Sequence, residues 1–180
     1  GERGGGLGII AGSRHGPRAM EGTPLARLLP VHIDPAFLGT YELRFWKKTA
    51  HRPFLDKAAE HIELGVQHGY VYRTNMSNAA EALFRLGMET LEDRSVVYHE
   101  RLEKALGLFS RARAYVASTL NSGNPRLHDF TSAAQVDLQL ISAHCFAGTP
   151  LQQLDSHITN FFDSFNKVAN ALARNYEPMV

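Results

Sequence analysis

Apolar side chains recur every three or four residues over most of the chain from residue 53 onward, which is the spacing of one face of an α-helix. A first stretch runs from Phe54 to about Gln67, directly after Pro53, whose missing N–H is tolerated in a first helical turn. A longer stretch runs from Asn78 to Leu120. It predicts either one helix or two helices separated at Asp93-Arg94-Ser95, a group that can end one helix and cap the next.

Two further helices are predicted after the turn residues Asn121–Pro125. One runs from about Thr131 to Ala147, and Gly148 ends it because glycine readily adopts the left-handed stop conformation. The other begins at a predicted capping box, in which Thr149 is the cap, Pro150 the first helical residue and Gln152 the residue that returns a hydrogen bond to the cap.

The last predicted helix carries a long apolar stripe with alternating spacings of three and four residues. Its members are Leu151, Leu154, Ile158, Phe161, Phe165, Val168 and Leu172. Such a stripe faces one groove along its length, so we expect it to be buried and the phenylalanines at 109, 161, 162 and 165 to supply the core. The replacement Phe165→Asp should then unfold the bundle by burying an unpaired charge.

The first forty residues have a different pattern, because they hold more than half of the fifteen glycines and four of the eight prolines. No long helix is expected there, and two short apolar runs, Leu7–Ala11 and Leu28–Ile33, are expected to be extended. Residues 41–52 can form one or two helical turns. The sequence therefore predicts an extended Gly/Pro-rich N-terminal arm over residues 1–52 and a helical-bundle domain over residues 53–180.

The expected fold class is all-α, an antiparallel bundle of about four main helices plus one shorter helix. A chain of 180 residues is long enough for one hydrophobic core and too short for two large independent ones. Hydrophobic residues make up 44% and charged residues 21%, which is typical of a folded globular chain rather than a disordered one.

Net charge and cysteine content restrict the partners and the compartment. The 19 Lys and Arg residues balance the 18 Asp and Glu residues, so the net charge of +1 gives no overall reason to expect nucleic acid or an anionic membrane. The single cysteine, Cys145, excludes an intrachain disulfide framework, and we expect it to be a core thiol in an intracellular, reducing compartment. An organelle reached after removal of a targeting peptide is the alternative. No apolar run is long enough for a transmembrane segment.

Candidate catalytic chemistry is sparse. His99-Glu100-Arg101-Leu102-Glu103 resembles the zinc-binding pattern H-E-x-x-H, but Glu103 stands where the second histidine would be. The run Gly6–Ala11 matches a relaxed dinucleotide fingerprint, yet too few residues precede it to form the strand that the fingerprint requires. We expect no catalytic residue, no metal and no cofactor.

Basic and aromatic residues of the arm are the candidate partner-binding residues. They are Arg14, Arg18, Arg44, Trp46, Lys47 and Lys48. Arg and aromatic residues are enriched at protein interfaces, so the first hypothesis is a non-catalytic structural or accessory subunit whose arm packs on other protein subunits of an assembly. One alternative is an RNA-binding or coat-like helical protein that uses the basic arm. The other is a metal-dependent enzyme that uses the helix face of His99, Glu100 and Glu103.

Overall fold

The computed structural model describes residues 35–175, and within this range the chain is all-α. Residues 1–34 of the predicted arm, which include Arg14 and Arg18, lie outside the described residues. The described elements are α1 (Pro35–Thr49), α2 (Arg52–Gln67), α3 (Arg73–Glu92), α4 (Tyr98–Leu120), α5 (Leu127–Phe146), the 3₁₀ turn η3 (Leu151–Gln153) and α6 (Asp155–Asn175).

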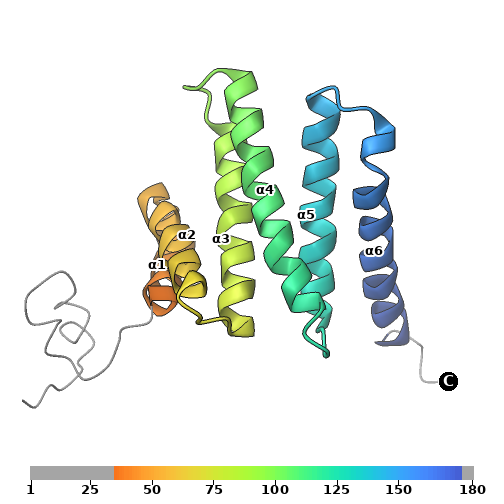
Figure 1. The fold of residues 1–180 in the computed structure, drawn as a ribbon, viewed down its shortest axis with the longest axis horizontal. Coiled ribbons are helices and arrows are strands. Elements are labelled where there is room, and N and C mark those ends of the chain that lie inside the picture. The colour runs from red at the N-terminus through yellow and green to blue at the C-terminus, as the bar shows by residue number, and fades with distance from the viewer. Residues whose placement is uncertain (1–34, 176–180) are drawn as a thin grey trace, which may run out of the picture. The chain divides into compact units, whose positions relative to one another are not determined.

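Each helix packs antiparallel against the helix that follows it in the chain, and α3, α4, α5 and α6 stand side by side (Figure 1). The expected all-α, antiparallel architecture is therefore confirmed. The long pattern up to Leu120 forms two helices, and the break lies at residues 93–97 as the Asp93-Arg94-Ser95 group suggested. There the Asp93 carboxylate accepts hydrogen bonds from both the backbone N–H and the hydroxyl of Ser95.

The prediction that the extended arm continues to residue 52 was wrong, because residues 35–49 form α1. Ala36, Gly39 and Leu43 are spaced by three and four residues and are buried. A Cβ added at Gly65 of α2 would lie 2.6 Å from both the N and the Cβ of Ala36, so the two backbones cross in close contact. Sequence reasoning missed this helix because its buried face uses small residues, which carry little hydrophobic signal.

The hydrophobic core runs through α1 to α5. Its largest fully buried side chains in these helices are Phe109, Leu55, Ile62, Leu83, Leu140 and Val116. Phe109 packs beside Gly87 of α3, where an added Cβ would lie 2.5 Å from the ring. Within the described part of the chain, no residue of α6 belongs to this core.

Helix α6 begins later than the sequence predicts, and its cap is different. Residues 151–153 form η3, α6 starts at Asp155, and no side-chain hydrogen bond caps η3. The Thr149 hydroxyl instead lies 3.1 Å from Nδ1 of His144, so the predicted Thr149–Gln152 capping box was wrong. Gly148 does take a left-handed conformation, with a φ of 75°, and ends α5 as expected.

The prediction that the α6 stripe is buried was also wrong in part. Leu154 is buried, and Ile158, Phe161 and Val168 are half-buried, but Phe165 is 50% exposed and Phe162 54% exposed. The reason is that α6 packs chiefly on α5, and one neighbouring helix covers only part of its apolar surface. The replacement Phe165→Asp is therefore no longer expected to unfold the helices.

Candidate interaction surface

The four candidate partner-binding residues within the described range lie on α1, and two of them pair with carboxylates of α3. The indole Nε1 of Trp46 donates to Glu89 at 2.7 Å, and Lys47 pairs with Glu81 at 2.7 Å. Arg44 and Lys48 are exposed and, with Tyr41 and Phe45, line a small surface hollow. The structure thus assigns Trp46 and Lys47 to contacts between α1 and α3, although Lys47 is itself exposed. Arg44 and Lys48 are exposed without such a contact to α3.

The residues of the metal-protein alternative, His99, Glu100 and Glu103, are exposed on α4. Among residues 35–175, no group of three or more His, Cys, Asp or Glu side chains is close enough to hold a metal ion. Cys145 is exposed on α5, so its expected place in the core was wrong.

A cavity of about 360 Å³ lies over α3 between α2 and α4. Leu83, Leu86 and Leu108 are among its apolar lining, and Glu63 pairs with Arg111 at its edge. Burial, together with this Glu63 carboxylate, raises the pKa of the nearby Tyr115 to about 12. At this edge of the cavity, Arg111 and Tyr115 therefore both donate hydrogen bonds to Glu63.

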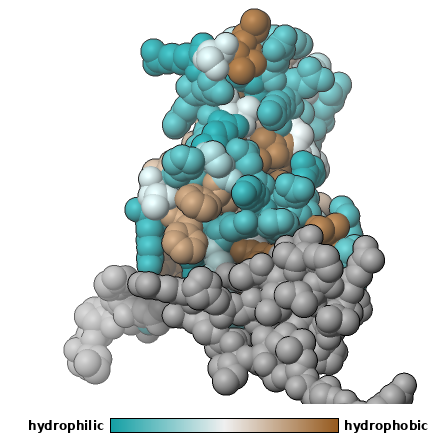
Figure 2. Space-filling model, turned by 90° about the vertical axis from the view of Figure 1, so that its left-hand side faces the viewer, coloured by the Kyte–Doolittle hydropathy of each residue, from teal (hydrophilic) through white to brown (hydrophobic). Residues whose placement is uncertain are grey.

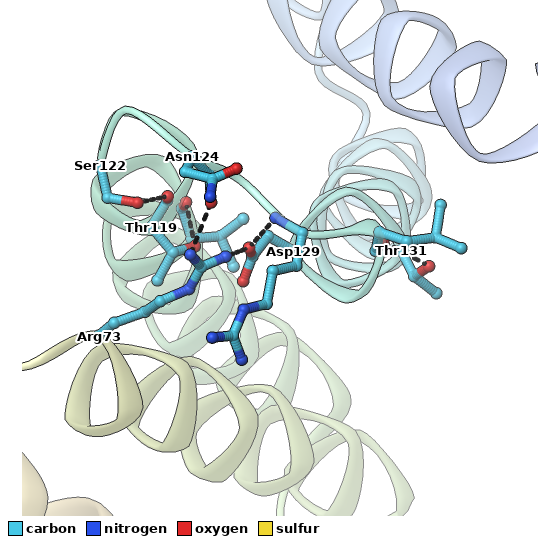
Figure 3. A network of polar contacts seen from close by, with 9 residues as sticks. Arg73, Thr119, Ser122, Asn124, Asp129 and Thr131 are labelled. Atoms are coloured by element: carbon cyan, nitrogen blue, oxygen red, sulfur yellow. Dashed lines mark hydrogen bonds and ion pairs between the residues drawn. The ribbon is translucent and has the colours of Figure 1, made fainter. Parts of the chain in front are cut away.

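Helix α5 carries only two Asp, Glu, Lys or Arg residues in its twenty, and both are buried. The first, Asp129, forms an ion pair with Arg73 of α3 and accepts a hydrogen bond from the backbone N–H of Arg126 at 2.7 Å (Figure 3). Arg73 also donates to the carbonyl of Asn124 at 2.7 Å. These bonds hold the start of α5 and the loop before it against α3.

The second, Asp137, joins three helices. Nε of Arg113 on α4 donates to both oxygens of Asp137, at 2.8 and 2.9 Å. Nδ1 of His157 on α6 lies 3.1 Å from Oδ1 of the same carboxylate, which can only accept, so Nδ1 is the protonated nitrogen. This network sets how α6 is rotated on α5.

The ring of His144 stacks on the ring of His157, with 6.1 Å between the centroids. Burial, and secondarily the neighbouring His157, lowers the pKa of His144. The folded protein therefore favours the neutral form of His144 at the α5–α6 contact.

With both carboxylates buried, the exposed surface of α5 has no Asp, Glu, Lys or Arg side chain. Its outer stripe again follows spacings of three and four residues and includes Leu138, which is 45% exposed. The stripe consists of Leu127, Thr131, Ala134, Leu138, Ile141 and Cys145. Helix α6 has a matching stripe, which consists of Ile158, Phe162, Phe165, Ala169 and Leu172, and the exposed Asp155 lies one turn before it.

The two stripes lie on the same side of the α5–α6 pair. In α5, Asp137 and His144 contact α6, and the stripe residues Leu138 and Cys145 directly follow them. In α6, His157 contacts α5, and Ile158 directly follows it. A step of one residue rotates the side chain by about 100°. In two antiparallel helices that face each other, the same rotation leads to the same side, so the stripes form one surface, the α5–α6 face.

The α5–α6 face is apolar and uncharged. The part of the opposite end that is visible in Figure 2, seen from the α1–α2 side, is mainly hydrophilic. Helix α1 also exposes three aromatic side chains on successive turns, those of Phe37, Tyr41 and Phe45. Contiguous exposed apolar surface marks sites of protein or membrane interaction. No helix within residues 35–175 has both the length and the apolar composition needed to cross a bilayer.

Comparisons of the chain with protein-family models, with curated proteins and with solved structures found no match. Sequence reasoning placed the candidate residues in the arm and missed the α5–α6 face. One signal could have found it, since residues 127–146 contain no Lys, Arg or Glu, which is unusual for a helix with a solvent-exposed side.

Proposed function

We propose that this protein is a non-catalytic subunit of a protein assembly and that its α5–α6 face packs against another protein chain. The observation that carries the proposal is the combination of half-exposed leucines and phenylalanines with an absence of charge on this face. Interface cores are depleted in charged residues and enriched in aromatic ones, and the α5–α6 face has both properties.

The arrangement of the helices adds a second argument. Helix α6 is amphipathic, yet among the described residues it contributes nothing to the hydrophobic core of its own chain. An amphipathic helix gains most of its stability by burying its apolar face. A partner that covers Phe162 and Phe165 would supply the burial that α5 alone does not.

The expected role of the N-terminal arm, which is to pack on neighbouring subunits through residues such as Arg14 and Arg18, remains part of this proposal. Arg44 and Lys48 on α1 are exposed and could extend such a contact. We also propose an intracellular, reducing compartment, because a chain with a single cysteine has no intrachain disulfide framework.

The test is site-specific photocrosslinking in cells that express the full chain. A photoreactive residue at Leu138, on the α5–α6 face, should form covalent adducts with protein. The same residue at Val97, an exposed apolar position between α3 and α4, is the matched control. Adducts at Leu138 that exceed those at Val97 are the expected result. Equal or no adducts at Leu138 would contradict the proposal.

A further inference from the structure

We infer that the partner of the α5–α6 face is the same face of a second copy of this chain, related by a two-fold axis. This inference rests on the proposed function, because it identifies the chain that the face binds. The resulting interface would combine α5 and α6 of both copies into a four-helix bundle.

The lack of charged side chains in the two stripes favours a second copy of the chain over other partners. Neither stripe contains an Asp, Glu, Lys or Arg side chain between its first and last residues. The exposed Asp155 lies one turn before Ile158, at the end of the α6 stripe. The other charged side chains, those of Asp163, Lys167 and Arg174, are rotated by more than a third of a turn from the centre of the α6 stripe. A charged partner surface would lose its hydration here without gaining an ion pair. An anionic bilayer surface would require Lys or Arg beside the apolar stripe, and the stripe has neither. A second copy presents a surface that is equally uncharged.

The shape of the face also fits a second copy. Both stripes follow the three-and-four spacing of helices that pack side by side in four-helix bundles, and α5 and α6 already form an antiparallel pair. A two-fold axis places the same patch on both sides of an interface, so a pair of apolar stripes meets an identical pair. Each α6 would then have helix neighbours on both sides of its apolar surface, as its sequence pattern requires.

Residues at the centre of the face include its largest exposed side chains. Phe162 and Phe165 are each about half exposed, and the ring of Phe165 stacks on Phe161 with 5.9 Å between the centroids. Large aromatic side chains at the centre of an interface contribute most of its binding energy. In a two-fold dimer each of them is buried twice, once in each copy.

The experiment is light scattering coupled to size-exclusion chromatography on the purified full chain over a range of concentrations. We expect a mass twice the 20.0 kDa of one chain, falling toward a single chain on dilution. Leu138→Glu and Phe165→Glu should each raise the dimer dissociation constant by at least about 100-fold, because each substitution buries two uncompensated charges in the dimer. Val97→Glu, at an exposed apolar position off the face, should leave it unchanged.

Cys145 provides a second readout, because it is the single cysteine of the chain and lies on the α5 stripe. Its reaction with a thiol reagent should be slower in the dimer than in the Leu138→Glu monomer. Circular dichroism should show the same helix content for wild type and variants, since the substituted positions are exposed within one chain.

A single-chain mass at every concentration would overturn the inference, as would a dimer that persists in both face variants. The proposed function fails separately. If the purified chain is monomeric but Leu138 still forms adducts with a different protein in cells, the second copy is excluded and the subunit role stands. If Leu138 forms no adducts, the subunit role is excluded as well.

Discussion

At the scale of single residues, the buried carboxylate of Asp137 shows how much of this molecule depends on partners that are distant in the sequence. Arg113 and His157 are 24 and 20 residues away from it, and each comes from a different helix. Asp137 is a charged residue among the apolar positions of α5. Because an aspartate is normally exposed unless it is paired, its burial could not be inferred from the sequence pattern. Only the approach of α4 and α6 makes a charge tolerable there.

Removing the charge of Asp137 should therefore destabilise the protein. We expect Asp137→Asn to lower the free energy of unfolding by about 3 kcal/mol, because it leaves the largely buried guanidinium of Arg113 without a counter-charge. Urea unfolding followed by circular dichroism measures the change. Asp163→Asn on the exposed side of α6 is the control and should change stability by less than about 0.5 kcal/mol. Equal effects of the two variants would contradict the assigned network.

His144 gives a prediction with a definite sign. Its pKa in the folded protein is lowered from 6.5 by burial and by His157, so the unfolded chain takes up the proton first as the pH falls. The stability that this group contributes is complete above pH 6.5 and is lost as the pH falls through the folded pKa. Unfolding in urea at pH 7.5 and 5.5 should show a smaller loss of stability for His144→Gln than for wild type. An identical loss in both proteins would exclude this role.

At the scale of the elements, the helices of this chain differ in how clearly the sequence pattern predicts them. The periodic leucines and alanines of α3, α4 and α5 predicted helices whose ends differ from the structure by a few residues. Helix α1 was missed because its contact with α2 is made by Ala36, Gly39 and Gly65, whose small side chains allow the close approach of the two backbones. Glycine in a helix lowers its local helix propensity, and here the tertiary contact outweighs that cost.

Opposite effects on stability are expected from alanine at Gly65, inside the α1–α2 contact, and at Gly107, which is outside it. Gly65→Ala should lower the free energy of unfolding by about 1–3 kcal/mol, because the new methyl group would overlap the backbone of Ala36. Gly107→Ala on the exposed side of α4 meets no atom within 4 Å and should raise it by roughly 0.5–1 kcal/mol through improved helix propensity. Urea unfolding of both variants separates the two effects. Stabilisation by Gly65→Ala would show that α1 does not cross α2 as described.

At the scale of the whole molecule, the helices pack in chain order, so among residues 35–175 the last helix has a helical neighbour on one side only. Because α6 packs chiefly on α5, the two helices together form the exposed α5–α6 face. Half of it comes from α5 and half from α6, and its uncharged character depends on the burial of Asp129 and Asp137.

If two copies share this face, thermal stability must depend on protein concentration, because association stabilises the folded state by mass action. The Tm of the wild-type chain should rise with each tenfold increase in concentration. The Tm of Leu138→Glu should stay constant, and that of Val97→Glu should follow the wild type. A Tm of the wild type that is independent of concentration would contradict the shared face.

The sequence by itself determined that the region from residue 53 onward is helical, where the main breaks between helices fall, and that the last helix is strongly amphipathic. These properties are local, because helical periodicity and turn residues act over a few neighbouring positions. Only the tertiary structure decided that α1 joins the helical domain, that Asp137 is hydrogen-bonded by Arg113 and His157, and that Phe165 is half exposed. The physical reason is that burial depends on how many other elements reach a side chain, and an apolar stripe is the same in sequence whether its partner lies in its own chain or in another.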